Sequence, residues 1–323
     1  MLDQYGRVIN YLRISVTDRC NLRCCYCMPE GVQDVGMKNI LTFEEIWEIV
    51  RTGVSLGITH IRITGGEPLV RKGCVDLIRG IREIPGVETI TMTTNGVLLG
   101  NYAKQLKEVG VDSVNISLDT LDPEEFYKIT GKRELQEVLT GIRAAKTAGL
   151  QVKLNAVNRK ELDPLPLVRY AQKENLPLRF IEMMPVGYGK KYVGRSNEEL
   201  RKTLATVCGN PECITDREEL SRMGSGPAVY YRFSDLKVPV GFISAIHGKF
   251  CDTCNRIRLT AEGYLKLCLC YDGGADLRRA LREGEKEKLR TIMEETIFRK
   301  PAAHCFEHPE EMTETHEMVK IGG

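Results

Sequence analysis

The feature that most constrains the fold of this chain is an alternation of strand-like and helix-like segments between residues 11 and about 183. Six apolar runs alternate with segments of helical periodicity and predict six strand–helix units. The runs are 11–16, 58–64, 88–94, 111–119, 150–157 and 176–184. Successive units of this kind give parallel strands joined by right-handed crossovers. Because a closed barrel of this type needs eight units, six predict an α/β fold with a partial, TIM-like (β/α)6 barrel.

Polar segments follow the first four of these strands. They are DRCNLRCCYC (18–27), GGEP (65–68), TTNG (93–96) and SLDT (117–120). In parallel α/β folds, ligands bind at the carboxyl ends of the strands, on the loops that follow them. The sequence therefore predicts an active site along this edge.

The alternation ends near residue 184. A charged, helix-like stretch (197–222) then precedes short strand-like pieces, and residues 275–297 have a charged helical pattern. A chain of 323 residues is long enough for two domains. We therefore predict a barrel domain at 1–183 and a smaller α+β domain at 184–323 that closes it.

Composition excludes several classes of protein. The net charge of +2 gives no global field for nucleic acid or a membrane surface. No apolar run reaches the roughly 18 residues that a membrane-spanning helix needs, and the first residues lack the pattern of a signal peptide. We expect a cytoplasmic protein that binds neither nucleic acid nor membrane.

Twelve cysteines in such a chain call for an explanation. In a reducing compartment, clustered cysteines more often hold metal than form disulfides. Cys20, Cys24 and Cys27 have the spacing C-x3-C-x2-C, with Cys25 off that spacing. Three thiolates on a 4Fe–4S cubane leave one iron open, as a catalytic centre requires. The alternative is a structural zinc site that uses Cys24, Cys27 and a distant pair.

A second set of cysteines lies near the other end of the chain. Cys251, Cys254 and Cys268 have the spacing C-x2-C-x13-C. A zinc ribbon completed by Cys270 competes with a second three-cysteine cluster on spacing alone. Arg256 and Arg258 stand two apart on a strand-like piece beside this set, so they share a face and suit an anionic ligand.

The quoted motifs resemble those of a known family. The first cysteine motif, with Tyr26 before its last cysteine, and the GGEP loop resemble the radical S-adenosylmethionine enzymes. The segment FCDTCNRIRLTAEG (250–263), a later Cys-Leu and the terminal IGG resemble, more narrowly, the GTP 3′,8-cyclases of molybdenum cofactor biosynthesis. This likeness extends over nearly the whole chain.

The resemblance implies a reaction and its cofactors. Two 4Fe–4S clusters with three cysteine ligands each are implied, on Cys20, Cys24, Cys27, Cys251, Cys254 and Cys268. S-adenosyl-L-methionine is cleaved reductively, and the 5′-deoxyadenosyl radical takes hydrogen from C3′ of GTP. C3′ then bonds to C8, giving (8S)-3′,8-cyclo-7,8-dihydroguanosine 5′-triphosphate.

The resemblance also implies roles for further residues. Positions that contact S-adenosylmethionine are Tyr26, Gly66, Ser117 and Met184, with Asn95 and Asp119 as further candidates. Positions that contact GTP are Arg13, Arg62, Thr93, Lys153, Arg256, Ile257 and Arg258. The catalytic positions are Arg13, Arg256, Arg258, Gly322 and Gly323, the two glycines entering the site with the C-terminal tail. From the residues alone, Glu67 is a candidate acceptor for the cofactor's amine.

Implied partners are an electron donor such as flavodoxin or ferredoxin, a second copy of the chain in a homodimer, and cyclic pyranopterin monophosphate synthase as the next enzyme. Two other functions compete: a radical enzyme that modifies peptides, and a non-catalytic regulator with zinc at both ends. For a single arginine the competing interpretation is a solvated surface charge, and for the tail it is a frayed terminus.

Overall fold

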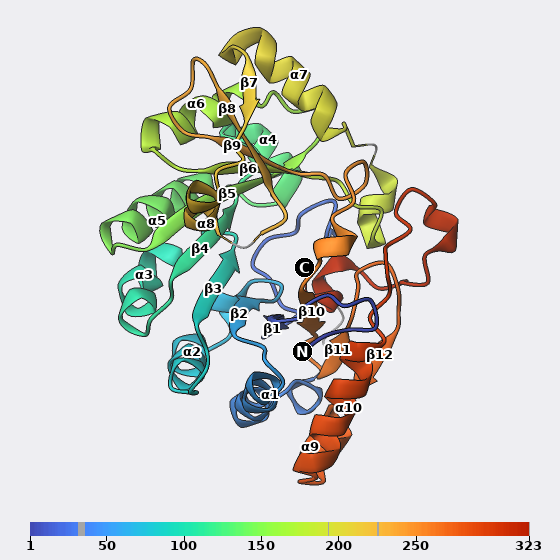
Figure 1. Cartoon of the computed structure of the whole chain (residues 1–323). Coiled ribbons are helices and arrows are strands. Elements are labelled where there is room, and N and C mark those ends of the chain that lie inside the picture. Colours follow the sequence, from blue (N-terminus) through green and yellow to red (C-terminus); the bar gives the residue numbers. More distant parts are fainter. Residues whose placement is uncertain (32–35, 193, 225, 323) are drawn as a thin grey trace.

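The computed structural model describes residues 1–31, 36–192, 194–224 and 226–322. In this part of the chain twelve strands form one sheet, in the order β12-β11-β10-β1-β2-β3-β4-β5-β6-β9-β8-β7 (Figure 1). The strands are β1 (Tyr11–Ser15), β2 (His60–Thr64), β3 (Thr89–Thr94), β4 (Ser113–Ser117), β5 (Gln151–Asn158), β6 (Leu178–Glu182), β7 (Pro211–Cys213), β8 (Val229–Phe233), β9 (Val240–Ile243), β10 (Arg256–Leu259), β11 (Tyr264–Lys266) and β12 (Gly274–Asp276).

Strands β1 to β6 are parallel and adjacent in chain order. The helices are α1 (Phe43–Ser55), α2 (Cys74–Arg82), α3 (Leu99–Glu108), α4 (Pro123–Thr130), α5 (Leu135–Thr147), α6 (Leu165–Glu174), α7 (Asn197–Cys208), α8 (Arg217–Met223), α9 (Arg278–Arg282) and α10 (Lys286–Phe298). Figure 1 shows α1, α2, α3 and α5 along the outer side of the curved sheet. The sheet does not close on itself, so the predicted partial barrel is confirmed.

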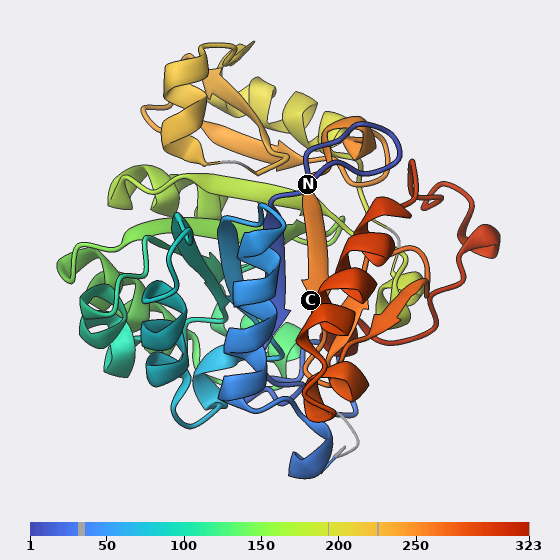
Figure 2. The same ribbon diagram turned by 60° about the horizontal axis from the view of Figure 1, so that its bottom comes forward.

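Strands from the C-terminal segment join both edges of this barrel. β10 pairs in parallel with β1, and β9 pairs in parallel with β6. The outer strands at both ends are antiparallel. Helix α10 lies beside α1 in both views (Figures 1 and 2). The C-terminal segment thus flanks the barrel on two sides, while the division at residue 183 stays a prediction.

Successive side chains on each strand point alternately to the apolar core outside the sheet and to the barrel interior. On β1, Leu12 and Ile14 are fully buried in the apolar core, while Arg13 between them lines an interior cavity. β10 repeats this pattern, with Ile257 in the core between two cavity-facing arginines. Apolar residues thus anchor each strand to the layers outside, and this packing holds the charged side chains of the other face in place.

Local capping signals mark the starts of α1 and α4. Thr42 and Glu45 form the predicted capping box at α1. Helix α4 was not predicted, although Asp122 caps it by accepting from the backbone N–H of Glu124 and Glu125. Within the described ranges no helix is long and apolar enough to cross a membrane.

Candidate active site

Two adjoining cavities occupy the barrel interior. The first, of about 290 Å³, contains Cys20, Cys24 and Cys27, and the second, of about 190 Å³, contains Cys251, Cys254 and Cys268. Their shared wall is made by Arg13, Arg62, Asn155, Ile181, Met184, Arg258 and Leu269. The two cysteine sets, separated by more than two hundred positions in the chain, therefore face one continuous interior.

The first cysteine loop turns tightly around its own cavity. The backbone N–H of Cys27 donates to the carbonyl of Cys24 at 2.9 Å, and Asn95 Nδ2 lies 3.6 Å from Cys20 Sγ. Burial raises the pKa of Cys20 to about 11 and that of Cys27 to about 12; burial and the Cys27 thiol raise that of Cys24. A metal centre is the cation that would let these thiols ionise.

These residues fit an iron–sulfur cluster. Among the side chains that the structure describes, no three His, Cys, Asp or Glu groups converge tightly enough to hold a single ion. A cubane binds each thiolate to a different iron, so it makes no such demand. The donor set, three thiols around one cavity, suits a 4Fe–4S cluster with an open iron.

Cys25 is directed elsewhere. Its Sγ accepts a hydrogen bond from Arg159 Nη1 at 3.5 Å, and its backbone N–H donates to Ile129. Cys25 is absent from the described residues that line the first cavity. Its position off the ligand spacing therefore corresponds to a different side-chain environment.

The glycines of the GGEP loop are required by packing. A Cβ on Gly66 would lie 2.3 Å from the carbonyl oxygen of Arg19, and one on Gly65 would lie 2.6 Å from that of Thr17. The N–H of Gly66 in turn donates to Thr17 at 2.7 Å. Any side chain here would push the GGEP loop away from the cysteine loop, so the two glycines fix the shape of the first cavity.

The prediction that the Glu67 side chain accepts a hydrogen bond from the cofactor's amine is wrong. Its carboxylate is fully buried and accepts from the N–H of Leu69, the hydroxyl of Thr94 and the N–H of Asn95. Burial raises its pKa to about 7. Both oxygens are thus engaged in joining the loops after β2 and β3, which leaves them turned away from the cavity.

The other residues implied for S-adenosylmethionine line the first cavity together. Tyr26, Gly66, Ser117 and Met184 all lie on its wall. The hydroxyl of Tyr26 donates to Asp119 Oδ2 at 2.8 Å, and Asp119 Oδ1 accepts from Val157 N–H. This bridge connects the cysteine loop to β4 and β5.

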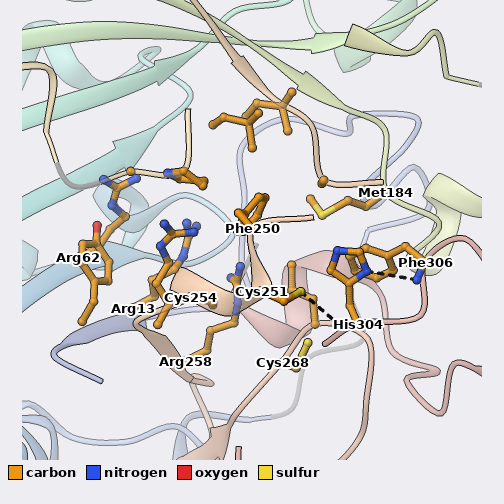
Figure 3. Close-up of a pocket in the computed structure, with 18 of the residues that line it drawn as sticks. Arg13, Arg62, Met184, Phe250, Cys251, Cys254, Arg258, Cys268, His304 and Phe306 are labelled. Atoms are coloured by element: carbon orange, nitrogen blue, oxygen red, sulfur yellow. Dashed lines mark hydrogen bonds between the residues drawn. The ribbon is translucent and has the colours of Figure 1, made fainter. Parts of the chain in front are cut away.

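Four arginines lie on three neighbouring strands; Arg13, Arg62 and Arg258 line both cavities, and Arg256 lines the second. In the strand register, Arg13 of β1 lies opposite Arg62 of β2 and Arg258 of β10. Arg256 lies two residues before Arg258 on β10. Burial, then Arg258 and Arg62, holds the pKa of Arg13 well below its usual range. Such a buried concentration of positive charge attracts an anion with several negative charges. Figure 3 shows Arg13, Arg62 and Arg258 on one side of the second cavity, with Cys251, Cys268 and His304 on the other.

The second cavity is held by contacts from both ends of the chain. The guanidinium of Arg7 donates to the carbonyls of Cys251 and Ala302 at 2.8 Å each, and to that of Pro301 at 2.7 Å. The backbone N–H of His304 lies 3.5 Å from Cys251 Sγ. These contacts connect the N-terminal segment and the chain after α10 to the loop that carries two of the predicted ligands.

Solved structures support the same architecture. Streptococcus suis SuiB bound to S-adenosylmethionine superposes with a TM-score of 0.66 at 14% identity, over 97% of this chain and 77% of SuiB. Native anSMEcpe with bound AdoMet gives a TM-score of 0.59 at 17% identity, over 90% of this chain and 81% of anSMEcpe. At such identities the likeness shows the fold alone.

Sequence relatives are more specific. Residues 14–162 match the family model of the Radical SAM superfamily, and residues 176–306 match that of Molybdenum Cofactor Synthesis C. GTP 3′,8-cyclase of Clostridium perfringens (strain SM101 / Type A) is 43% identical over 330 residues, covering 100% of both chains. GTP 3′,8-cyclase of Peptoclostridium acidaminophilum is 45% identical over 336 residues, covering 100% of this chain and 98% of the relative.

The chain belongs to the GTP 3′,8-cyclase family. The resemblance drawn from the motifs is thereby confirmed over the full length. The predicted cofactors, S-adenosyl-L-methionine and 4Fe–4S clusters, are those of this family.

Not every residue carried over from the GTP 3′,8-cyclases lies on a cavity wall. Thr93 does, and its hydroxyl is buried with no hydrogen-bond partner in the described part of the chain. Lys153 and Ile257 are not among the described wall residues: Lys153 Nζ donates to the carbonyl of Met223 at 2.7 Å, and Ile257 packs in the core. Burial, followed by Arg179 and Arg62, lowers the pKa of Lys153 to about 8.

The C-terminal tail of this family member enters the barrel. The carbonyl of Gly322 accepts from Arg258 Nη1 at 2.6 Å, and Gly322 is buried with a φ of 80°. Met318 and Val319 line the first cavity. Within the described residues this tail is therefore packed rather than frayed, while Gly323 lies outside them.

Three basic residues of the second cavity were not predicted from the sequence. Arg179, Lys300 and His304 line it. Arg179 interrupts the apolar run of β6, and a charge in a buried strand was the available signal. Burial, then Lys249, lowers the pKa of His304, and Glu307 and the backbone of Ala245 offset this only in part.

Proposed function

We propose that this chain is a radical S-adenosylmethionine lyase that converts GTP to (8S)-3′,8-cyclo-7,8-dihydroguanosine 5′-triphosphate, the first step of molybdenum cofactor biosynthesis. The observation that carries the proposal is the row of arginines on β10, β1 and β2, between two cavities that each present three cysteines. Full-length relatives that are named GTP 3′,8-cyclases support it.

Each cavity holds one cluster in this proposal. Cys20, Cys24 and Cys27 hold the first, with S-adenosylmethionine among Tyr26, Gly66, Ser117 and Met184; Cys251, Cys254 and Cys268 hold the second. When bound, the reduced first cluster supplies the electron that cleaves S-adenosylmethionine to the 5′-deoxyadenosyl radical. Met184 lies on the walls of both cavities, so cofactor and substrate meet beside it.

The protein's own task is to place GTP and exclude water. Arg13, Arg62, Arg256 and Arg258 bind the triphosphate and offset its charge, with Thr93 and Lys153 as further contacts. The tail covers the site through the Arg258–Gly322 contact, which fixes one guanidinium nitrogen and leaves the others for substrate. We propose Gly322, on this contact, and Gly323, on the family resemblance alone, as members of the catalytic group. A radical intermediate needs such enclosure, because solvent and other donors would quench it.

The remaining partners follow from this chemistry. A one-electron donor such as flavodoxin or ferredoxin reduces the first cluster, and cyclic pyranopterin monophosphate synthase consumes the product. We also propose a homodimer and a cytoplasmic location. All twelve cysteines are free thiols in the structure, as a reducing compartment would keep them.

Anaerobic incubation of the iron-reconstituted protein with GTP, S-adenosylmethionine and a reductant tests the proposal. We expect about eight irons per chain, consumption of GTP, and equimolar 5′-deoxyadenosine. Formation of 5′-deoxyadenosine with GTP unchanged would favour an enzyme that acts on another substrate, such as a peptide. About two zincs and no iron would favour the non-catalytic regulator.

A paired substitution separates substrate binding from cluster assembly. Arg258→Ala should lose GTP turnover and keep the iron, because Arg258 faces the boundary between the cavities. Arg232→Ala is the control, since Arg232 is an exposed residue of β8 whose partner is Glu219. Loss of iron in Arg258→Ala would show that this arginine is structural.

A further inference from the structure

Two cysteines outside both proposed cluster sites face each other. Cys270 Sγ and Cys305 Sγ are 2.9 Å apart, and the backbone N–H of Cys305 lies 3.2 Å from Cys270 Sγ. Both are buried, Cys270 completely and Cys305 to all but 7%. Neither is among the described residues that line the first or the second cavity. Cys270 therefore has Cys305 as its sulfur partner and does not complete a zinc ribbon with the second cysteine set.

The pair joins two segments that are 35 positions apart. Cys270 follows Cys268 by two residues, while Cys305 follows His304, whose N–H contacts Cys251 Sγ. Both sulfurs lie in a small apolar cluster with Val186, Phe306 and Ile321, which holds the C-terminal tail. A bond between the two sulfurs would thus connect the segment that carries Cys268 with the segment that carries His304, both of which line the second cavity.

We propose that Cys270 and Cys305 are a redox-active dithiol that closes to a disulfide when the protein meets a peroxide, and so fastens the segment after β11, which carries Cys268, to the segment after α10, which carries His304. This inference goes beyond the cyclase activity and does not depend on the substrate. A disulfide has its sulfurs about 2.05 Å apart, so the two must approach by less than about 1 Å.

The chemistry balances with a peroxide as the oxidant. The Cys305 sulfur, the more exposed of the two, attacks one peroxide oxygen, and the O–O bond breaks to give a sulfenic acid and one water. The Cys270 sulfur then displaces the hydroxyl of the sulfenic acid, which leaves as a second water, and the S–S bond forms. Two thiols lose two electrons and two protons, and hydrogen peroxide becomes two waters.

The bridge has a consequence for the second cluster. If iron is lost under oxidation, the chain that carries Cys251, Cys254 and Cys268 would be free to rearrange and cross-link wrongly. The Cys270–Cys305 bond closes a long loop, which restricts the conformations that the iron-free protein can reach. We therefore expect the bridge to preserve the arrangement of the second site until iron and reductant return.

Peptide mapping of the holoprotein after hydrogen peroxide treatment tests the proposal directly. We expect one dominant cross-linked peptide pair, containing Cys270 and Cys305, that thiol reductant separates. Cys305→Ser should abolish it, and Cys74→Ser should not, because Cys74 is a buried cysteine of α2 remote from the pair. Cross-links confined to the predicted ligand cysteines, or Cys305 recovered as a free thiol, would overturn the proposal.

The consequence has its own readout in iron content. Oxidised protein is stripped of iron with a chelator, reduced, and reconstituted anaerobically. We expect wild type to regain about eight irons and Cys305→Ser to lose part of that recovery. Equal recovery in both would refute the protective role. Failure of either protein to turn over GTP would concern the proposed function alone, because neither mapping nor iron content uses substrate.

Discussion

Arg7 is expected to hold the second cluster loop through backbone carbonyls. Its side chain is 7% exposed and that of its ion-pair partner Asp3 is 0% exposed, with Nε 2.6 Å from Oδ2. Asp3 also accepts from the N–H of Tyr5 and of Arg7. These hydrogen bonds outweigh the effect of burial and lower the pKa of Asp3 below its usual value.

Arg7→Met keeps the length of the side chain and removes all of its donors. It leaves a buried carboxylate without its partner, which typically costs about 3–5 kcal/mol. The carbonyls of Cys251, Pro301 and Ala302 lose their donors as well. Since a domain is stable by only about 5–15 kcal/mol, we expect a large decrease in the free energy of unfolding in urea.

The effect on iron should be local. Arg7 contacts the carbonyl of Cys251 and no described residue of the first cavity. The iron content of Arg7→Met should therefore fall from about eight to about four irons per chain. Arg279→Met is the control, because Arg279 is an exposed residue of α9 paired with Glu283. The double variant Asp3→Asn/Arg7→Met removes the isolated charge. It should regain part of the unfolding free energy and little of the iron.

A pH series separates the two parts of this effect. In wild type the lowered pKa of Asp3 gives stability that is present above about pH 3.9 and is lost as the pH falls through the folded-state value. In Arg7→Met the carboxyl can take up a proton more readily, so the difference from wild type should shrink in acid. Arg7→Met that binds about eight irons and unfolds like wild type would refute the reasoning.

Four further substitutions test other parts of the protein. Cys24→Ser should lose the first cluster and all 5′-deoxyadenosine formation, whereas Cys25→Ser should retain both; equal losses in an iron assay would contradict the ligand assignment. Glu67→Gln places an amide where three donors point, so the free energy of unfolding should fall by about 1–3 kcal/mol. Because burial raises the pKa of Glu67 to about 7, wild type should lose stability as the pH rises from about 4.3 towards 7, and a flat profile would contradict this. Lys266→Met leaves the fully buried Glu314 without its ion-pair partner and should cost about 3–5 kcal/mol in thermal or urea unfolding. Burial opposes ionisation of Glu314, but Lys266 and His316 lower its pKa overall, so in wild type that stability should be lost as the pH falls below about 4.3.

The sequence was sufficient to predict the barrel and the cysteine sets because both depend on short-range patterns. The period of two that buries Ile257 and exposes Arg256 and Arg258 to the cavity is visible in four letters of sequence. The C-x3-C-x2-C spacing is equally local. Helix α4 was not predicted because its eight residues are too few to show a clear helical period. The capping residue Asp122 is its main sequence signal.

Contacts between distant segments could not be predicted from such patterns. Glu67 looked available to a ligand, because nothing in GGEP shows that donors from the end of β3 and from the loop after it reach both of its oxygens. The pairing of Cys270 with Cys305 depends on how the segment after α10 folds back onto the segment after β11. Arg7 lies 244 positions from the carbonyl that it contacts. In each case the chemistry of the residue was clear and its partner was not.

The row of arginines illustrates why such partners matter for function. Guanidiniums on adjacent strands repel one another. Burial lowers the pKa of Arg258 to about 10; the charge of Arg256 adds to this decrease, and Cys268 opposes it. Burying like charges costs folding free energy, which the alternating core residues of β1, β2 and β10 must offset. In the proposed function, the triphosphate of GTP offsets this repulsion with negative charge. The barrel thus places positive charge where the proposed substrate would need it.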